Sequence, residues 1–355
     1  MSKMIEKSWD KLFRLVYRER PNSQNERCDL SLFVGAGLSM ANGMPSWAKL
    51  VAGLSMHKAN KAQKIVAQLQ EDGVSLPRQL SVLEADFLKQ GTRANWIERI
   101  RESLYEGLFQ QLQEEGLDGP ATLLPLLKFG ATNDRSVDKF FRKRNRSLYE
   151  IVKMCSVERK GKPRIISVLT TNLDALLQLC DRAVHGTPRK LRTIERSSKT
   201  AETYKVPLYQ LHGYLTPVKT SARKEAADSL VLTEQEFNAR TDQPYHWAAT
   251  VLHRALVEGP VLFVGCSMDD ELCRRALYRT RQQRLDDAYA ESDSRGMKAE
   301  SPRHFAVCQY HENEITNKFI EENLRIIDVA PVWVKDFNSI ELPERLSKLR
   351  KVLKR

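Results

Sequence analysis

The chain lacks any paired cysteine motif. Its 355 residues include six cysteines, and no two of them form a C-x-x-C pair. Zinc ribbons and thiol-redox motifs of the usual spacing are therefore excluded, and we expect no metal site. Several cysteines lie within apolar runs, which favours buried free thiols in a reducing compartment. The six are Cys28, Cys155, Cys180, Cys266, Cys273 and Cys308.

The sequence also lacks a long apolar segment. No window approaches the roughly eighteen uninterrupted apolar residues of a membrane helix. The first twenty residues are amphipathic and charged, without the apolar stretch of a signal peptide. We therefore expect a cytoplasmic protein with no membrane partner.

Hydrophobic residues and charge are both plentiful. The chain is 41% hydrophobic and 8% aromatic, which excludes global disorder and allows a sizeable core. Its length suits two average domains or one large α/β domain. The formal net charge of +12 fits a nucleic acid, an acidic protein or a small anionic ligand, and charge alone does not rank these partners.

A glycine-containing turn organises the rest of the chain. Leu30–Val34 is a short apolar run typical of a buried parallel strand, and Gly35 and Gly37 follow it. Glycine lets the backbone turn sharply and approach a ligand closely, and a helix that starts there directs free N–H groups at an anion. The pattern indicates a dinucleotide-phosphate cradle, with a purely structural turn as the alternative.

This stretch departs from the usual nucleotide fingerprints. Met40 occupies the position of the third glycine, and no acidic residue falls between Gly35 and Gln70. An ordinary hydride-transfer dehydrogenase is therefore disfavoured. A Walker-type phosphate loop is excluded because no Gly-Lys-Ser/Thr follows the glycines.

Two further segments each have two interpretations. Ser46 is expected to cap a helix from Trp47 to Met56, in which Trp47 either plugs the core or covers a ligand. Lys139–Arg146, KFFRKRNR, is a basic run with two phenylalanines. It is either a solvated helix face or a contact for a nucleic acid or another partner.

Hydrophobic periodicity separates strands from helices. It predicts helices through most of residues 58–160, and strands that alternate with helices afterwards. The expected strands are Ile165–Thr170, Val206–Leu211, Pro260–Val264, His304–Cys308 and Arg325–Val329, with a helix over Glu314–Glu321 and a surface loop over Arg279–Arg303.

This alternation predicts an α/β fold, a Rossmann-like doubly wound parallel sheet with an α-helical insertion. We expect one domain over residues 1–355, whose core comprises 28–57 and 161–335. The insertion covers 58–160, a leading helix lies in 1–27 and a C-terminal helix in 336–355.

Polar clusters follow four of the expected strands. They read GAGLS, TTNLD, HG and GCSMDD, and each begins at the end of an apolar run or just after it. In open α/β sheets, ligands bind outside the carboxyl ends of the strands. We therefore expect one site that contains Ser39, Asn172, Asp174, His212 and Ser267.

The order of these motifs resembles the sirtuin-like NAD+-binding family. The first motif is GAGLS with Gly43 and Pro45, followed by TTNLD at 170–174, HG at 212–213 and a glycine-serine turn at 265–267. Two features depart from the protein deacetylases of that family. Ser46-Trp47-Ala48 stands where they carry an acidic residue, phenylalanine and arginine, and no cysteine lies between Cys180 and Cys266, where they usually carry a zinc ribbon.

The resemblance is therefore to the bacterial sirtuin-like effectors of antiphage defence. It implies hydrolysis of NAD+ to nicotinamide and ADP-ribose, a homo-oligomer and, in some members, a HerA-like ATPase partner. Two other functions stay open. One is a sirtuin-like protein deacylase or ADP-ribosyltransferase, and the other is a non-catalytic NAD+ or ADP-ribose sensor or DNA-associated scaffold.

The residue types suit this chemistry. Asn172 would hold a ribose hydroxyl or water, and His212 would accept a proton, because a histidine titrates at about pH 6.5. Asp174 would bind the nicotinamide amide or stabilise positive charge, although Asn172 and Asp174 could instead only cap the following helix. Ser39 and the amides of 35–37 would hold the diphosphate, and Gly265 and Ser267 the adenosine side. The expected cofactor-binding residues are Gly35, Ala36, Gly37, Ser39, Pro45, Trp47, Thr171, Gly265 and Ser267.

Overall fold

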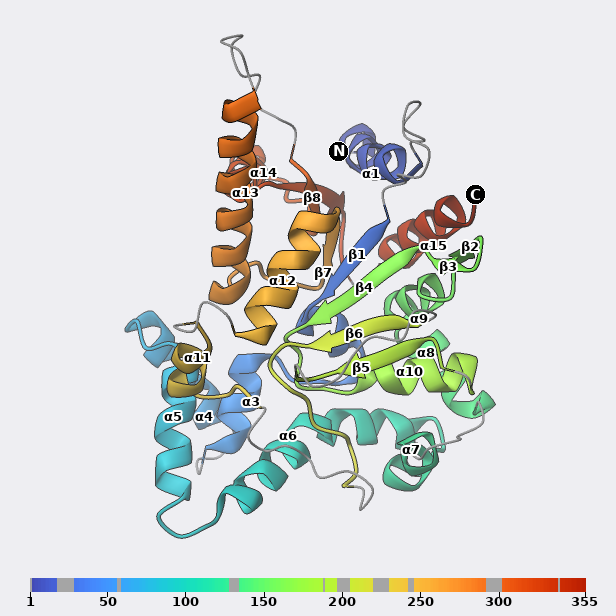
Figure 1. Cartoon of the computed structure of the whole chain (residues 1–355). Helices are drawn as coiled ribbons and strands as arrows, with labels where there is room; N and C mark the ends of the chain where they lie inside the picture. The colour runs from blue at the N-terminus through green and yellow to red at the C-terminus, as the bar shows by residue number, and fades with distance from the viewer. Residues whose placement is uncertain are drawn as a thin grey trace.

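A seven-stranded parallel sheet forms the centre of the molecule (Figure 1), in the order β5-β6-β4-β1-β7-β8-β9. The computed structural model describes residues 2–17, 29–55, 59–127, 134–187, 189–196, 205–219, 230–241, 246–291, 302–337 and 339–355. The strands are β1 (Leu30–Val34), β4 (Ile165–Thr170), β5 (Leu191–Ile194), β6 (Val206–Gln210), β7 (Val261–Val264), β8 (His304–Gln309) and β9 (Val329–Val334).

The sheet is doubly wound about β1. The chain first adds β4, β6 and β5 on one side of β1, and then returns to add β7, β8 and β9 on the other side. Successive side chains of β1 alternate between two cores: Leu32 and Val34 join one, and Phe33 joins the other. This arrangement confirms the predicted α/β Rossmann-like fold, and its switch point lies at the carboxyl ends of β1 and its two neighbours.

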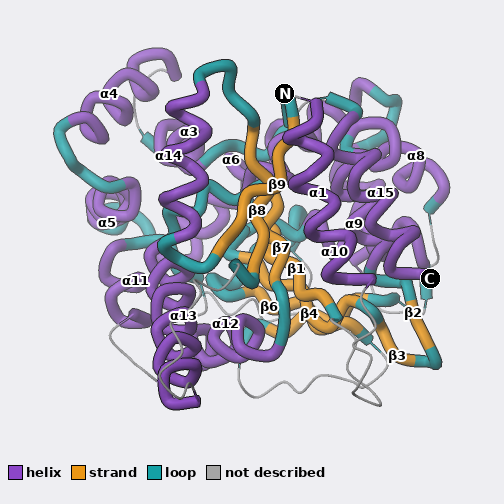
Figure 2. The backbone as a smooth tube through the Cα atoms, turned by 90° about the horizontal axis from the view of Figure 1, so that it is seen from above, coloured by secondary structure: helices purple, strands orange, loops and turns teal. Residues whose placement is uncertain are grey.

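Helices cover both faces of the sheet (Figure 2). The core of Leu32 includes residues of α1 (Ser2–Tyr17), α9 (Arg146–Met154), α10 (Leu176–His185) and α15 (Glu341–Lys354). The core of Phe33 includes residues of α12 (Trp247–Glu258), α13 (Glu271–Glu291) and α14 (Glu314–Arg325). None of the described helices combines the length and the apolar character that a membrane crossing requires.

A series of helices lies between β1 and β4 in the chain. After the short α2 (Ala36–Ser39) and a 3-10 turn come α3 (Trp47–Leu54), α4 (Ala59–Glu71), α5 (Leu76–Phe87), α6 (Arg93–Glu114), α7 (Gly119–Leu127), α8 (Arg135–Arg144) and α9, and then the small hairpin β2–β3 (Glu158–Arg159 and Lys162–Pro163). The prediction of helices over most of 58–160 is thus confirmed, whereas the domain boundaries stay predictions. Figure 1 shows α6 crossing below the carboxyl ends of the central strands.

The segments on the far side of the sheet differ from the predictions. The region expected to be a loop from Arg279 is helical as far as Glu291; Thr280 is buried one turn after Ala276 and Leu277, and its hydroxyl donates to the carbonyls of both residues. Residues 292–301 of that prediction lie outside the described residues.

The sheet differs from the predictions at both of its ends. The expected strand Arg325–Val329 is wrong, since α14 runs to Arg325 and β9 starts only at Val329, after the positive φ of Asp328. The strand β5 was not predicted, because only its first and last residues are buried and it shows no alternation.

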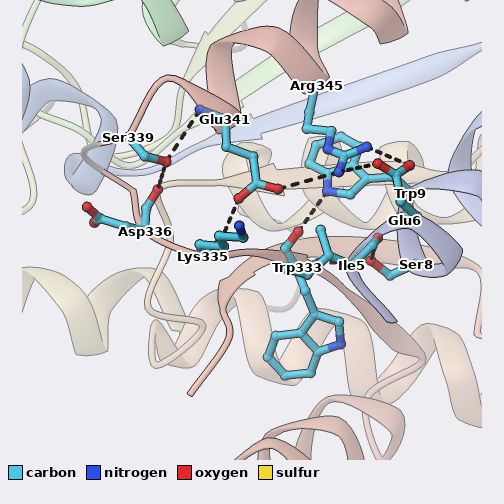
Figure 3. A network of polar contacts seen from close by, with 10 residues as sticks. All are labelled: Ile5, Glu6, Ser8, Trp9, Trp333, Lys335, Asp336, Ser339, Glu341 and Arg345. Atoms are coloured by element: carbon cyan, nitrogen blue, oxygen red, sulfur yellow. Dashed lines mark hydrogen bonds and ion pairs between the residues drawn. The ribbon is translucent and has the colours of Figure 1, made fainter. Parts of the chain in front are cut away.

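The edge strand β9 is closed by side chains of α1 (Figure 3). The even-numbered residues of β9 bond toward β8, which leaves Pro331 and Trp333 facing outward. Proline has no N–H to offer, Ser8 Oγ accepts from the Trp333 N–H at 3.0 Å, and Trp9 Nε1 donates to the Trp333 carbonyl at 2.8 Å. Because open edges invite pairing with other chains, α1 protects the sheet at this margin.

Candidate functional site

Three of the expected site residues form one hydrogen-bonded group. Asn172 and Asp174 follow β4, and Ser39 ends α2, which follows β1. The Asn172 Nδ2 donates to Ser39 Oγ at 3.1 Å, and the Ser39 hydroxyl also bonds the Asp174 carboxyl group. All three residues are at most 7% exposed. The neighbouring strands β1 and β4 thus bring Ser39, Asn172 and Asp174 together in one buried polar cluster.

His212 lies at the end of the next strand along the sheet. Thr170 of β4 is paired with Gln210 of β6, so Asn172 and His212 each lie two residues beyond this register pair. The Leu211 N–H donates to the Thr170 carbonyl at 2.9 Å, which holds the two strand ends together. The buried His212 ring packs edge-on against Phe237 of α11 (Glu234–Thr241), with ring centroids 5.0 Å apart. The three expected catalytic residues, Asn172, Asp174 and His212, therefore lie at the same edge of the sheet, after adjacent strands.

The glycine turn after β1 contacts the turn after β7 backbone to backbone. The Gly35 N–H donates to the Val264 carbonyl and the Gly37 N–H to the Gly265 carbonyl, each at 2.9 Å. A Cβ placed on Gly35 would lie 2.4 Å from the Gly265 oxygen, and Gly265 has a φ of +69°. Two of the three amides expected to face a diphosphate are therefore engaged within the chain.

The remaining expected cofactor-binding residues form a more accessible rim. Gly37 and Ser267 are exposed, and the others in this group are half-buried: Ala36, Pro45, Trp47, Thr171 and Gly265. Trp47 is the first residue of α3 and packs partly against the core, with Ser46 as the expected cap, whose Oγ accepts from the Lys49 N–H. The site residues thus separate into an accessible rim and a buried polar cluster.

Asp174 has an environment that opposes its charge. Burial raises the pKa of the Asp174 carboxyl group, and hydrogen bonds from the Leu176 N–H, Ser39 and Asn172 only partly offset this. The Leu176 N–H donates to Asp174 Oδ1 at 3.0 Å, so Asp174 contacts the first turn of α10, although the N-cap position is Ala175 and carries no side-chain cap.

Sequence reasoning missed residues that support this cluster from other elements. Gln210 at the end of β6 is fully buried, its Nε2 lies 3.5 Å from the Asp174 carbonyl, and its Oε1 has no hydrogen-bond partner within the described part of the chain. The sequence could have indicated Gln210, because it follows Val206 and Leu208 on the buried side of the strand, where a polar residue breaks the apolar alternation. Tyr105 of α6 is another such residue, and no local pattern indicates its contacts.

The basic run KFFRKRNR attaches helices to one another and to the site. Phe140 and Phe141 are buried in the core, while Lys143 and Arg144 form ion pairs with Glu115 at 2.8 and 2.6 Å. Arg142, Lys143 and Arg146 are exposed, as a solvated helix face would have them, and a contact with a nucleic acid or another partner stays a prediction.

Asn145, in the same run, connects the helices to the glycine turn. Its Oδ1 accepts from the Leu148 N–H and thereby caps α9. Its Nδ2 donates to the Leu38 carbonyl at 2.7 Å and to Asn42 Oδ1 at 2.8 Å. The segment that carries Ser39 is therefore held in place by a helix more than 100 residues away in the sequence.

The described cysteines are free thiols, as expected. Cys155, Cys180 and Cys273 are buried, and Cys266 and Cys308 are half-buried, while Cys28 lies outside the described residues. Burial raises the pKa of all five, that of Cys308 to about 12, so the thiols stay protonated at neutral pH. Across the ranges that the structure describes, no three or more His, Cys, Asp or Glu side chains are placed to share a metal ion.

Comparison with known families relates part of the chain to one of them. Residues 166–327 match the model of the SIR2-like domain. This segment starts within β4 and contains the TTNLD, HG and GCSMDD motifs, but not the glycine turn after β1. No curated protein matches the chain. The match supports a relationship to sirtuin-like proteins and an activity that involves NAD+.

Proposed function

We propose that this protein hydrolyses NAD+ at the nicotinamide–ribose bond and releases nicotinamide and ADP-ribose. The proposal depends on one observation above all. Ser39, Asn172 and Asp174 form a buried polar cluster, and His212 follows the strand next to β4; all but Ser39 lie in the segment that matches a SIR2-like domain.

The reaction needs orientation more than it needs a strong acid or nucleophile. Cleavage builds positive charge on the anomeric carbon of the ribose, and nicotinamide already leaves readily from the oxidised cofactor. The protein must hold the sugar, place a water molecule and stabilise the developing charge. A compact set of neutral amides and hydroxyls with one carboxyl group and one imidazole is suited to these tasks.

Each residue has a role that follows from its contacts. The Nδ2 of Asn172 is fixed by Ser39, so its Oδ1 is the atom that would accept from a ribose hydroxyl or a water. His212 would accept the proton that a ribose hydroxyl or the attacking water releases. Asp174 holds Ser39 in place and would bind the nicotinamide amide or stabilise positive charge.

NAD+ would lie across the switch point of the sheet. The Ala36 backbone and Ser39 would contact the diphosphate, and Gly265 and Ser267 the adenosine side. Gly35 and Gly37 would contribute through the close backbone packing that shapes this surface. Pro45, Trp47 and Thr171 would complete the half-buried rim around the ligand.

We further propose that this hydrolysis depletes NAD+ in a bacterial antiphage response by a cytoplasmic homo-oligomer, with a HerA-like ATPase as a partner. The support is the motif order together with two absences from the sequence: the arginine expected after Pro45 and the four cysteines of a zinc ribbon. Both absences weigh against a groove for an acylated protein substrate.

The test compares Asn172→Ala and His212→Ala with the unmodified protein. Each variant is expected to lower nicotinamide release by about a hundredfold or more, measured by chromatography of NAD+, nicotinamide and ADP-ribose. Asn60→Ala and His253→Ala, which change exposed residues of α4 and α12, are the matched controls and should retain full activity.

Unchanged turnover in both site variants would reject the assignment. Transfer of ADP-ribose to a protein, or loss of an acyl group from a peptide, would indicate the sirtuin-like transferase or deacylase instead. Tight binding of NAD+ by the unmodified protein without any product would indicate a sensor.

A further inference from the structure

The hydroxyl of Tyr105 joins the two loops that carry the proposed catalytic residues. It donates to the Leu215 carbonyl at 2.7 Å and accepts from the Ala175 N–H at 2.7 Å. Ala175 directly follows Asp174, and Leu215 lies three residues after His212. Tyr105 itself is fully buried and belongs to α6, which crosses below the strand ends (Figure 1). A single phenol group thus connects both loops to a helix outside the sheet.

Other contacts act in parallel with this one. The Leu215 N–H donates to the Leu173 carbonyl at 2.8 Å, which ties the two loops directly. Arg101, one turn before Tyr105 on α6, donates to the Thr216 carbonyl, and the residue is only 4% exposed. Arg101 also bonds Glu98 at 3.0 Å, so its buried charge is compensated. Two successive turns of α6 therefore hold the loop that follows His212.

Tyrosine suits this position because its hydroxyl both donates and accepts. Burial raises the pKa of Tyr105 well above its usual value, and the neighbouring Asp174 adds to this shift. The phenol therefore keeps its proton and its donor role at neutral pH. Phenylalanine would keep the ring but would leave a buried N–H and a buried carbonyl without this partner, which is costly for both loops.

We propose that Tyr105 is a positioning residue that sets the spacing between the Asn172–Asp174 segment and His212. This inference rests on the proposed NAD+ hydrolysis for its catalytic meaning, whereas the placement of the loops is independent of it. It gives α6 a role in the reaction, because the helix acts as a strut against which both strand-end loops are held. Tyr105 acts through Asn172, Asp174 and His212 and does not itself contact the reacting atoms.

The experiment uses Tyr105→Phe in the full chain, with Tyr149→Phe as the matched control. Tyr149 is also a largely buried tyrosine, on α9 in the part of the chain between β1 and β4. Its hydroxyl bonds Asp138 on α8. For Tyr105→Phe we expect kcat for nicotinamide release to fall by about ten- to a hundredfold while KM for NAD+ changes by less than about threefold. Amide hydrogen exchange should rise in peptides that cover residues 171–176 and 211–216. Tyr149→Phe should leave kcat and this exchange unchanged.

The outcomes separate this inference from the proposed function. Wild-type kcat and exchange in Tyr105→Phe, or equal effects of the two substitutions, would overturn the positioning role. If the unmodified protein released no nicotinamide, the proposed function would fail, while the exchange measurement would still decide whether Tyr105 holds the two loops. Should Tyr105→Phe not fold, Arg101→Lys provides a second variant, which should raise exchange at residues 214–217 and lower kcat with little change in KM.

Discussion

Two polar networks in this protein differ in how completely their buried groups are hydrogen-bonded. At the edge strand, Ser8 and Trp9 occupy both outward backbone groups of Trp333, and Arg345 of α15 pairs with Glu6 and Glu341 (Figure 3). At the strand ends, Asp174 is a buried carboxyl group with a raised pKa, and the Oε1 of Gln210 has no partner among the described residues.

The difference separates a stabilising network from a functional one. Groups that are all paired contribute to the free energy of unfolding and offer little to a ligand. A buried carboxyl group and an unpaired amide oxygen cost stability in the free protein, and such costs concentrate at functional sites. Substitutions in the edge network should therefore change stability but not turnover, and substitutions at the strand ends should do the reverse.

The largest expected effect on stability is that of Trp9→Ala. Trp9 is fully buried, and the change removes both its packing and its hydrogen bond to Trp333. We expect the free energy of unfolding to fall by about 3–5 kcal/mol in urea denaturation, with turnover per folded molecule unchanged. Tyr17→Ala, at the exposed end of the same helix, should cost under about 0.5 kcal/mol. Equal effects of the two changes would show that α1 is not an integral part of the core.

Asp174→Asn should separate stability from activity. Because burial raises the folded-state pKa of Asp174 above its ordinary value of 3.8, its favourable contribution is complete below about pH 4 and is lost as the pH rises through the raised pKa. The asparagine variant lacks this loss, so we expect it to be at least as stable as the unmodified protein at neutral pH. Turnover should nevertheless fall by about tenfold or more.

Urea titrations across pH 3 to 8 measure this effect. Asp286→Asn, at an exposed position of α13, should leave the pH dependence of stability as it is. An Asp174→Asn protein with the same pH dependence as the unmodified chain would contradict the assigned environment of Asp174.

Glu6→Gln should have the smallest effect. The Arg345 guanidinium lies 2.8 Å from Glu6 and lowers the pKa of that half-exposed carboxyl group. Its contribution is therefore present above about pH 4.5 and is lost as the pH falls through the lowered pKa. We expect a loss of less than about 1 kcal/mol at neutral pH, smaller still in high salt. A loss that persisted unchanged at low pH would mean that packing, not charge, is responsible.

Much of the sheet could be predicted because each central strand is recognisable from its own residues. Continuous apolar runs marked β1, β4 and β7, and the polar residues after them follow in sequence, so the cluster of Ser39, Asn172 and Asp174 could be expected from the topology. The strand β5 could not, because only two of its four residues are buried and its place depends on pairing with β6.

The contribution of the helices to the site could not be predicted. The Tyr105 hydroxyl bonds Ala175 and Leu215, which lie 70 and 110 residues away in the sequence. Asn145 bonds Leu38, which lies 107 residues away. Nothing in the spacing near Tyr105 or Asn145 distinguishes them from ordinary core and surface residues of a helix. Their roles follow from where the helices pack, which the helical periodicity does not determine.

The closure of β9 also limits how several copies of this protein can join. A strand from a second molecule cannot extend the sheet beside Pro331 and Trp333 while α1 stays docked. Pro331 has no N–H to donate, and the N–H and the carbonyl of Trp333 are already bonded to Ser8 and Trp9. A larger particle built from this subunit therefore cannot form by adding a strand beside β9 unless α1 first leaves this edge.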